Sequence, residues 1–129
     1  SLPPFTTIKA RLRVRDTQGK PAIPAPYDEF LAAIRALLSP VEVDEAWNLA
    51  TYPDVAAAIR DGKVASAREH FLHNGYFEGR WPFAINVDEQ WYLTENPGVR
   101  DYIRSGRLRG AQQHFDHDGY REGRLPFPL

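Results

Sequence analysis

The stretch HFLHNGYFEGRWPF at residues 70–83 returns 44 residues later as HFDHDGYREGRLPF at residues 114–127. The match extends without a gap to residues 43–83 against 87–127, with 21 identities in 41 aligned positions. Self-similarity at a fixed period is typical of a duplicated supersecondary unit. Because enzyme sites are usually asymmetric, two copies of one motif favour a scaffold or a binding module.

Each copy predicts three short helices divided by stop signals. In the first copy we expect a helix over 43–52 capped by Asp44, and a second over 53–61 that begins with a proline and stops at Gly62. A third helix is expected from Ser66 to an Asn-Gly pair at residues 74–75. The second copy repeats these signals, except that Gly110 replaces the Ser66 cap.

The N-terminal segment, residues 1–42, predicts one strand and one helix. Apolar and basic residues alternate from Ile8 to Val14, the period-two pattern of a half-buried strand, and residues 27–38 have helical spacing. The fold is therefore predicted to be mainly α: two tandem three-helix repeats, 43–83 and 87–127, packed together into one compact domain after this helix and N-terminal β-strand.

The predicted strand has no good partner within the chain. Three prolines, Pro21, Pro24 and Pro26, follow it, and proline cannot donate to a strand ladder. Because an unpaired strand recruits other chains, we expect residues 8–14 to pair with a second copy, giving a homodimer, or with another protein. A weak local hairpin across residues 16–19 is the alternative.

Composition narrows the class of protein. The chain has 129 residues with 43% hydrophobic and 26% charged, an ordinary globular mixture. A net charge of −1 gives no reason to expect nucleic acid as a partner, and no apolar run is long enough for a membrane span. Without cysteine, disulfides and thiolate catalysis are excluded. The absence of methionine indicates an excised piece of a larger protein, whose compartment stays open.

Four histidines are the sharpest candidates for chemistry. His70 with His73, and His114 with His117, are spaced so that each pair lies near one helical face and could bind zinc. His70 and His114 also fall beside the apolar side of the third helix. We therefore assign them structural roles, hydrogen bonded to backbone or a carboxylate, and predict no metal and no cofactor.

We assign two further sets of residues, one to structural roles and the other to ligand binding. The Glu-Gly-Arg turn is expected to tie itself to the adjacent helix by charge-assisted bonds, and the repeated tryptophans to lie in the core. These structural residues are Glu78, Glu122, Trp47 and Trp91. The candidate ligand-binding residues are the turn arginines, the one unrepeated tryptophan and the basic stripe of the strand: Arg80, Arg124, Trp81, Arg11, Arg13 and Arg15. Trp81 is expected to be the more exposed tryptophan.

The repeat resembles a short bacterial repeat of the form NPDVAAAV…G…HYL..G..EGR.PF. The first copy carries PDVAAAI at residues 53–59 and EGRWPF at 78–83, and the second carries NPGV at 96–99 and EGRLPF at 122–127. Such repeats are accessory modules beside glycosyltransferases of surface-polysaccharide synthesis and in secreted or surface proteins. The resemblance implies a carbohydrate-related context and supplies no catalytic residue.

These observations predict a non-catalytic interaction module of a larger bacterial surface-polysaccharide-related or secreted protein, which binds a partner protein or a glycan. A dedicated carbohydrate-binding domain is the alternative, and a small enzyme or metal-binding domain comes third.

Overall fold

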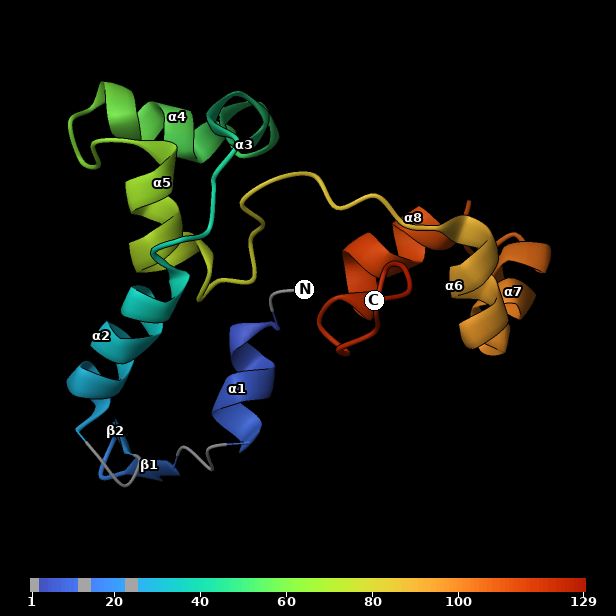
Figure 1. Ribbon diagram of the computed structural model, residues 1–129, viewed down its shortest axis with the longest axis horizontal. Helices are drawn as coiled ribbons and strands as arrows, with labels where there is room; N and C mark the ends of the chain where they lie inside the picture. The colour runs from blue at the N-terminus through green and yellow to red at the C-terminus, as the bar shows by residue number, and fades with distance from the viewer. Residues whose placement is uncertain (1–2, 12–14, 23–25) are drawn as a thin grey trace. The chain divides into compact units, whose positions relative to one another are not determined.

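The computed structural model describes residues 3–11, 15–22 and 26–129. The predicted mainly helical fold is confirmed (Figure 1). The contacts divide the chain into two compact units, one of Ile8–Ala84 and one of Ser1–Thr7 with Ile85–Leu129, so each unit contains one repeat. We call residues 43–83 repeat 1 and residues 87–127 repeat 2. Their packing against each other stays a prediction.

The N-terminal strand prediction is wrong for residues 8–11, which lie in α1 (Phe5–Arg11), while residues 12–14 lie outside the described part of the chain. Lys9, Ala10 and Arg11 are good helix formers, and the alternation over residues 8–14 does not outweigh that preference. A helix satisfies its own backbone groups. The reason to expect a homodimer through an unpaired strand is therefore lost over residues 8–11.

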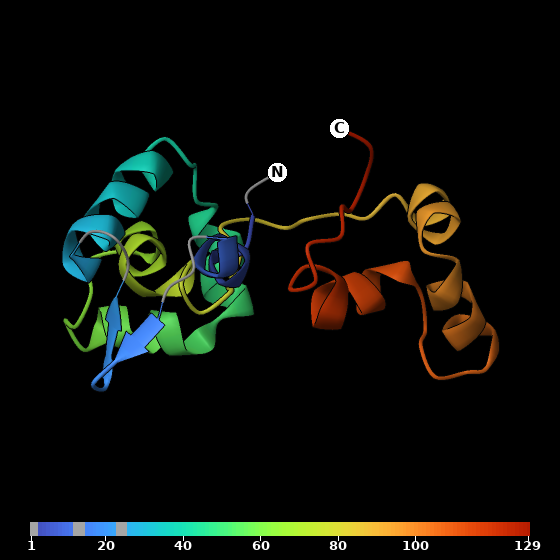
Figure 2. The same ribbon diagram turned by 90° about the horizontal axis from the view of Figure 1, so that it is seen from below.

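A small antiparallel hairpin follows, which is the alternative that the sequence left open. Strand β1 (Arg15–Thr17) pairs with β2 (Lys20–Ala22), with Asp16 opposite Pro21 (Figure 2). Gln18 and Gly19 both have positive φ, 54° and 76°, as a two-residue hairpin turn requires. The hairpin tolerates its proline because it has only two strands.

Repeat 1 is built from α3 (Glu45–Thr51), α4 (Pro53–Arg60) and α5 (Ala67–His70), and α5 continues into the π-helical turn η1 (Phe71–Gly75). The three helices contact one another, and η1 also contacts α2 (Tyr27–Leu38) (Figure 1). The core contains the buried side chains of Leu38, Val55, Phe71 and Tyr76.

Repeat 2 has the same succession of elements: α6 (Glu89–Glu95), α7 (Pro97–Arg104), α8 (Ala111–His114) and η2 (Phe115–Gly119). Its three α-helices again contact one another (Figure 2). The buried side chains include Tyr92, Val99, Phe115 and Tyr120.

The predicted helix ends are confirmed. Asp44 accepts a hydrogen bond from the Trp47 amide at 3.0 Å, and Ser66 accepts one from the Glu69 amide at 3.0 Å. Gly62 has φ of 73°, the left-handed conformation that stops a helix at little cost only for glycine.

The two ends of each repeat are joined by one backbone hydrogen bond. The Asp44 amide donates to the Pro82 carbonyl at 2.9 Å, and the Asp88 amide donates to the Pro126 carbonyl at 2.9 Å. The backbone at the end of each repeat therefore lies beside the backbone at its beginning, and the turn residues lie beside the first helix of the same repeat.

Candidate interaction site in repeat 1

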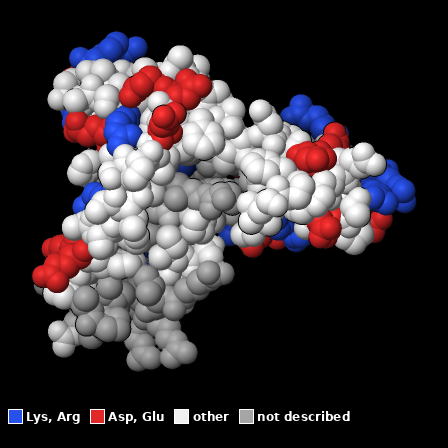
Figure 3. Space-filling view, in the orientation of Figure 1, with Lys and Arg blue, Asp and Glu red and all other residues white. Residues whose placement is uncertain are grey.

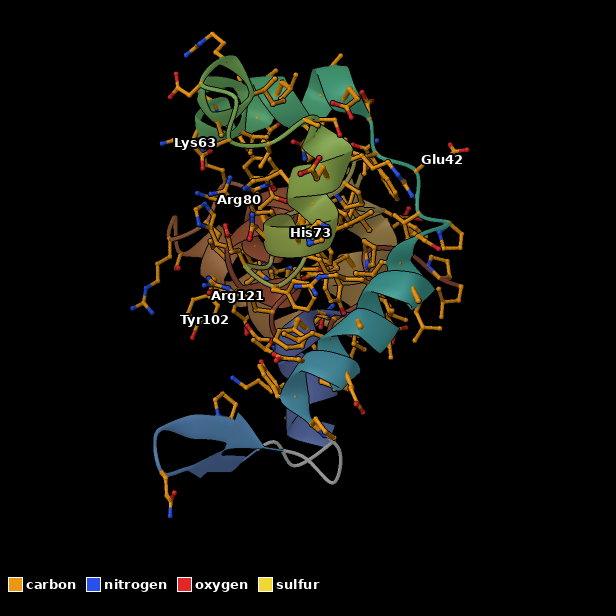
Figure 4. The ribbon with its side chains drawn as sticks, turned by 90° about the vertical axis from the view of Figure 1, so that its left-hand side faces the viewer. Glu42, Lys63, His73, Arg80, Tyr102 and Arg121 are labelled. Carbon is orange, nitrogen blue, oxygen red and sulfur yellow. The ribbon has the colours of Figure 1, made fainter. Side chains whose placement is uncertain are left out.

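Arg80, which leaves the Glu-Gly-Arg turn, reaches the neighbouring helix as the sequence predicted (Figure 4). Its two terminal nitrogens donate to the two carboxylate oxygens of Asp54 on α4, at 2.9 and 2.7 Å. Its Nε lies 2.9 Å from a carboxylate oxygen of Glu78. One guanidinium thus holds two carboxylates, one of them in the bidentate geometry that arginine favours.

Tyr52 completes this arrangement from the end of α3. The Arg80 guanidinium carbon lies 5.0 Å from the centre of the Tyr52 ring, a cation–π distance. The Tyr52 hydroxyl accepts a hydrogen bond from the Trp81 amide at 3.0 Å. We call Tyr52, Asp54, Glu78 and Arg80 the hook face of repeat 1.

The hook face combines opposite charges at partial exposure. The side chains of Asp54, Glu78 and Arg80 are 60%, 47% and 24% exposed. The hydrogen bond from Arg80 holds the pKa of Asp54 below its ordinary value of 3.8, and the same bond raises the pKa of Arg80. Asp54 and Arg80 are therefore charged at neutral pH and oriented by each other, so the hook face can offer both donors and acceptors to a ligand.

Repeat 2 keeps the turn and loses part of this face. Arg124 donates from Nε and a terminal nitrogen to Glu122, at 3.1 and 3.0 Å, and also donates to the Asn96 side chain. Asn96 and Gly98 replace Tyr52 and Asp54, so this copy has neither the aromatic ring nor the second carboxylate. Of the two turn arginines, Arg80 and Arg124, only Arg80 belongs to a face with an aromatic ring.

The tryptophans lie between core and surface. Trp47 and Trp91 are each half-buried, and Trp47 packs edge-on against Tyr52 with ring centres 6.0 Å apart. Trp81 is half-buried as well, so its predicted greater exposure stays a prediction. Its carbonyl accepts a hydrogen bond from the Asn48 side chain at 3.1 Å, which fixes the backbone beside the hook face.

The histidines differ between the copies. His114 is 7% exposed, and its Nδ1 lies 2.6 Å from the Tyr92 hydroxyl, so its partner is a phenol and not the backbone or carboxylate that we expected. His70, the equivalent residue, is half-exposed, and its ring makes no hydrogen bond with the described residues. His73 (Figure 4) is exposed, and so is His117. Among the described residues no group of three or more histidine, aspartate or glutamate side chains could hold a metal ion.

The predicted basic stripe does not exist as one strand face. Arg11 ends α1, Arg15 begins β1, and Arg13 lies outside the described residues. In the view of Figure 3, lysine and arginine are interspersed with aspartate and glutamate. This mixture agrees with the net charge of −1 and does not favour a polyanionic ligand.

Sequence reasoning missed three residues: Tyr52 and Asp54 of the hook face, and Tyr92 in the interior of repeat 2. The signal that could have found them is the difference between the copies, because all three occupy positions where the copies do not match. An interpretation based only on the residues that the two copies share does not find these positions.

None of the helices in the described part of the chain is long and apolar enough to cross a bilayer. Comparison with protein-family models, with curated proteins and with solved structures finds no match for this chain.

Proposed function

We propose that this chain is a non-catalytic interaction module that binds a partner protein or a glycan, and that the hook face of repeat 1 is its contact surface. The observation that carries the proposal is the contrast between the copies. Both keep the aspartate cap of the first helix, the glycine turns and the turn arginine, whereas Tyr52 and Asp54 of repeat 1 have become Asn96 and Gly98. The shared residues maintain the frame, and the differing ones leave repeat 1 with the richer surface.

The chemistry of the hook face suits recognition of neutral polar groups. Two carboxylates accept hydrogen bonds, and one partly exposed guanidinium donates them, within a few ångströms of an aromatic ring. Sugar hydroxyls and the amides of a peptide both present paired donors and acceptors that such a set can satisfy. Because Arg80 and Asp54 hold each other, the set is oriented before a ligand arrives, which lowers the entropic cost of binding.

The resemblance of the repeat to modules found beside glycosyltransferases supports placing the parent protein among bacterial surface-polysaccharide-related or secreted proteins. A dedicated carbohydrate-binding domain is the second candidate, favoured by half-buried Trp81 at the edge of the hook face. An enzyme or a metal-binding domain ranks third, because the charged groups of the hook face are engaged with one another.

Binding by the intact parent protein tests the proposal, in two parallel assays: a glycan array and a pull-down from cells of the producing organism. The informative variant is Asp54→Asn, which keeps the side chain's shape and removes the charge that orients Arg80. The matched control is Asp118→Asn, which removes an exposed carboxylate that pairs with Arg121 in repeat 2 at 3.7 Å. Thermal unfolding by circular dichroism checks that both variants fold.

We expect Asp54→Asn to weaken binding at least tenfold and Asp118→Asn to leave it unchanged. Equal binding by both variants would remove the hook face as the contact surface. Failure of the parent protein to retain any glycan or protein would refute the interaction module itself.

A further inference from the structure

One interior position differs sharply between the repeats. Asn48 in repeat 1 is 3% exposed, and Tyr92 stands at the equivalent place in repeat 2 with 0% exposure. The residues around this position are the same in both copies: a histidine, a phenylalanine and a glycine, which are His70, Phe71 and Gly75 in repeat 1. The two copies therefore fill one interior frame with side chains of different length.

In repeat 2 the Tyr92 hydroxyl fills the end of this space. It lies 2.6 Å from Nδ1 of His114, and only 2.2 Å from the place where a Cβ on Gly119 would stand. The Phe115 ring lies 3.4 Å from that same place. The hydroxyl is therefore in contact with the glycine and bonded to the imidazole.

In repeat 1 the described residues place no atom as close to the glycine as that hydroxyl is in repeat 2. Around the corresponding point on Gly75, the nearest atoms are Phe71 Cδ1 at 3.4 Å and His70 Nδ1 at 3.5 Å. The phenylalanine four residues earlier lies at 3.4 Å in both repeats, so the two helical turns have the same local geometry. Asn48 is too short to reach the imidazole as the phenol does.

Two polar side chains of repeat 1 also have atoms without partners among the described residues. The Asn48 side chain donates to the Trp81 carbonyl through Nδ2, but its buried Oδ1 accepts no hydrogen bond from the described residues. A buried acceptor without a partner is costly, at about 1–3 kcal/mol. His70 in turn makes no side-chain hydrogen bond with the described residues.

We propose that Asn48, His70 and Gly75 form a binding site for one hydroxyl group, supplied by water or by a small alcohol, at the position that the Tyr92 hydroxyl occupies in repeat 2. A hydroxyl can donate to Oδ1 of Asn48 and exchange a hydrogen bond with Nδ1 of His70, which satisfies both groups. Because His70 is half-exposed whereas His114 is 7% exposed, the site in repeat 1 is open to exchange with solvent. This inference is independent of the hook face.

The test is an NMR measurement of nuclear Overhauser effects on the whole chain, first in water and then with added ethanol. We expect a cross peak from the bound hydroxyl molecule to the α-protons of Gly75. The α-protons of Gly119 serve as an internal control and should give none, because the Tyr92 hydroxyl covers them. A peak from water alone identifies a water site, and a further peak from the ethanol methyl group identifies a site that also takes alcohols. Absence of both peaks at Gly75 overturns the proposal.

A second measurement uses the variant Asn48→Tyr, which places a phenol where repeat 2 has one. We expect its folding equilibrium constant to stay within about tenfold of the wild-type value, and the Gly75 cross peaks to disappear. A larger fall would show that other side chains already fill the space, since inserting extra atoms into a packed core is strongly destabilising. That result would overturn the proposal as well.

Discussion

Replacing Gly119 by alanine should destabilise this protein far more than replacing Gly75, although the two glycines occupy equivalent places in the repeats. A Cβ on Gly119 would stand 2.2 Å from the Tyr92 hydroxyl, a distance that real Cβ atoms essentially never show. A Cβ on Gly75 would meet its nearest neighbour, Phe71 Cδ1, at 3.4 Å, which needs little adjustment. Both backbones are helical, so positive φ plays no part.

The magnitude follows from what must move. In Gly119→Ala the Tyr92 hydroxyl has to shift by about 1 Å, which costs about 1–3 kcal/mol for overpacking. The shift also breaks its hydrogen bond to His114 inside the core, which costs another 1–3 kcal/mol or so. Together these costs are about 2–6 kcal/mol, and the better helix propensity of alanine offsets about 1 kcal/mol of them, so we expect a net loss of about 1–5 kcal/mol. In Gly75→Ala the better helix propensity of alanine, about 1 kcal/mol, offsets the tighter contact, and stability should change by less than about 1 kcal/mol.

Urea denaturation followed by residue-resolved hydrogen exchange measures both variants. The exchange data matter because the chain has two compact units, and the loss should appear among residues 85–129. A double variant, Gly119→Ala with Tyr92→Phe, removes the clashing hydroxyl and leaves the ring carbon Cζ at 3.4 Å. It should lose less stability than the two single variants added together. Equal stability of Gly119→Ala and Gly75→Ala, or strict additivity in the double variant, would refute this account.

Three further predictions concern stability. Ser66→Ala should cost about 1 kcal/mol in urea denaturation because the helix loses its cap, whereas Ser66→Gly should cost only a few tenths; equal losses would contradict the capping role. Because Arg80 lowers the pKa of Asp54, the bond between them stabilises the folded state above the unfolded pKa of about 3.8, and this stability is lost as the pH falls below that value. In Asp54→Asn the free energy of unfolding should therefore depend less on pH in the acid range, while at neutral pH it should change by less than about 1 kcal/mol. Burial raises the pKa of Tyr76 and Tyr92 from 10.0 to about 12, so the stability that depends on their neutral hydroxyls is complete below pH 10 and falls as the pH rises through 12. Phenylalanine at both positions should reduce alkaline unfolding. An unchanged dependence of unfolding on alkaline pH would contradict the assignment of these pKa values.

The helices of the repeats were predictable because their signals are local. A cap such as Asp44 or Ser66 acts on an amide three residues away, and Gly62 needs only its own backbone conformation. The hook was predictable in kind, since an arginine after a glycine turn beside a helix tends to find a carboxylate. Its partner on the helix, Asp54, could not be predicted, because Asp54 lies 26 residues from Arg80 and only the folded chain brings the two together.

The N-terminal segment shows the opposite case. From Ile8 to Val14 the alternation of apolar and basic residues indicated a strand. The structure has α1 over residues 8–11, where the helix propensity of Lys9, Ala10 and Arg11 outweighs the pattern. The π-helical turns after His70 and His114 were also unpredicted. Their hydrogen bonds run from Tyr76 to the Phe71 carbonyl and from Tyr120 to the Phe115 carbonyl, five residues apart, a geometry with no simple sequence signal.

The sequence by itself determined the duplication, the helical class and the helix ends, because these depend on residues near one another in the chain. Only the tertiary structure decided how each copy fills its interior. Tyr92 and Asn48 occupy the same position in the repeat, yet one bonds the imidazole of His114 and the other turns to the carbonyl of Trp81. That choice depends on distances between side chains far apart in the sequence, and on whether a glycine leaves room for a hydroxyl.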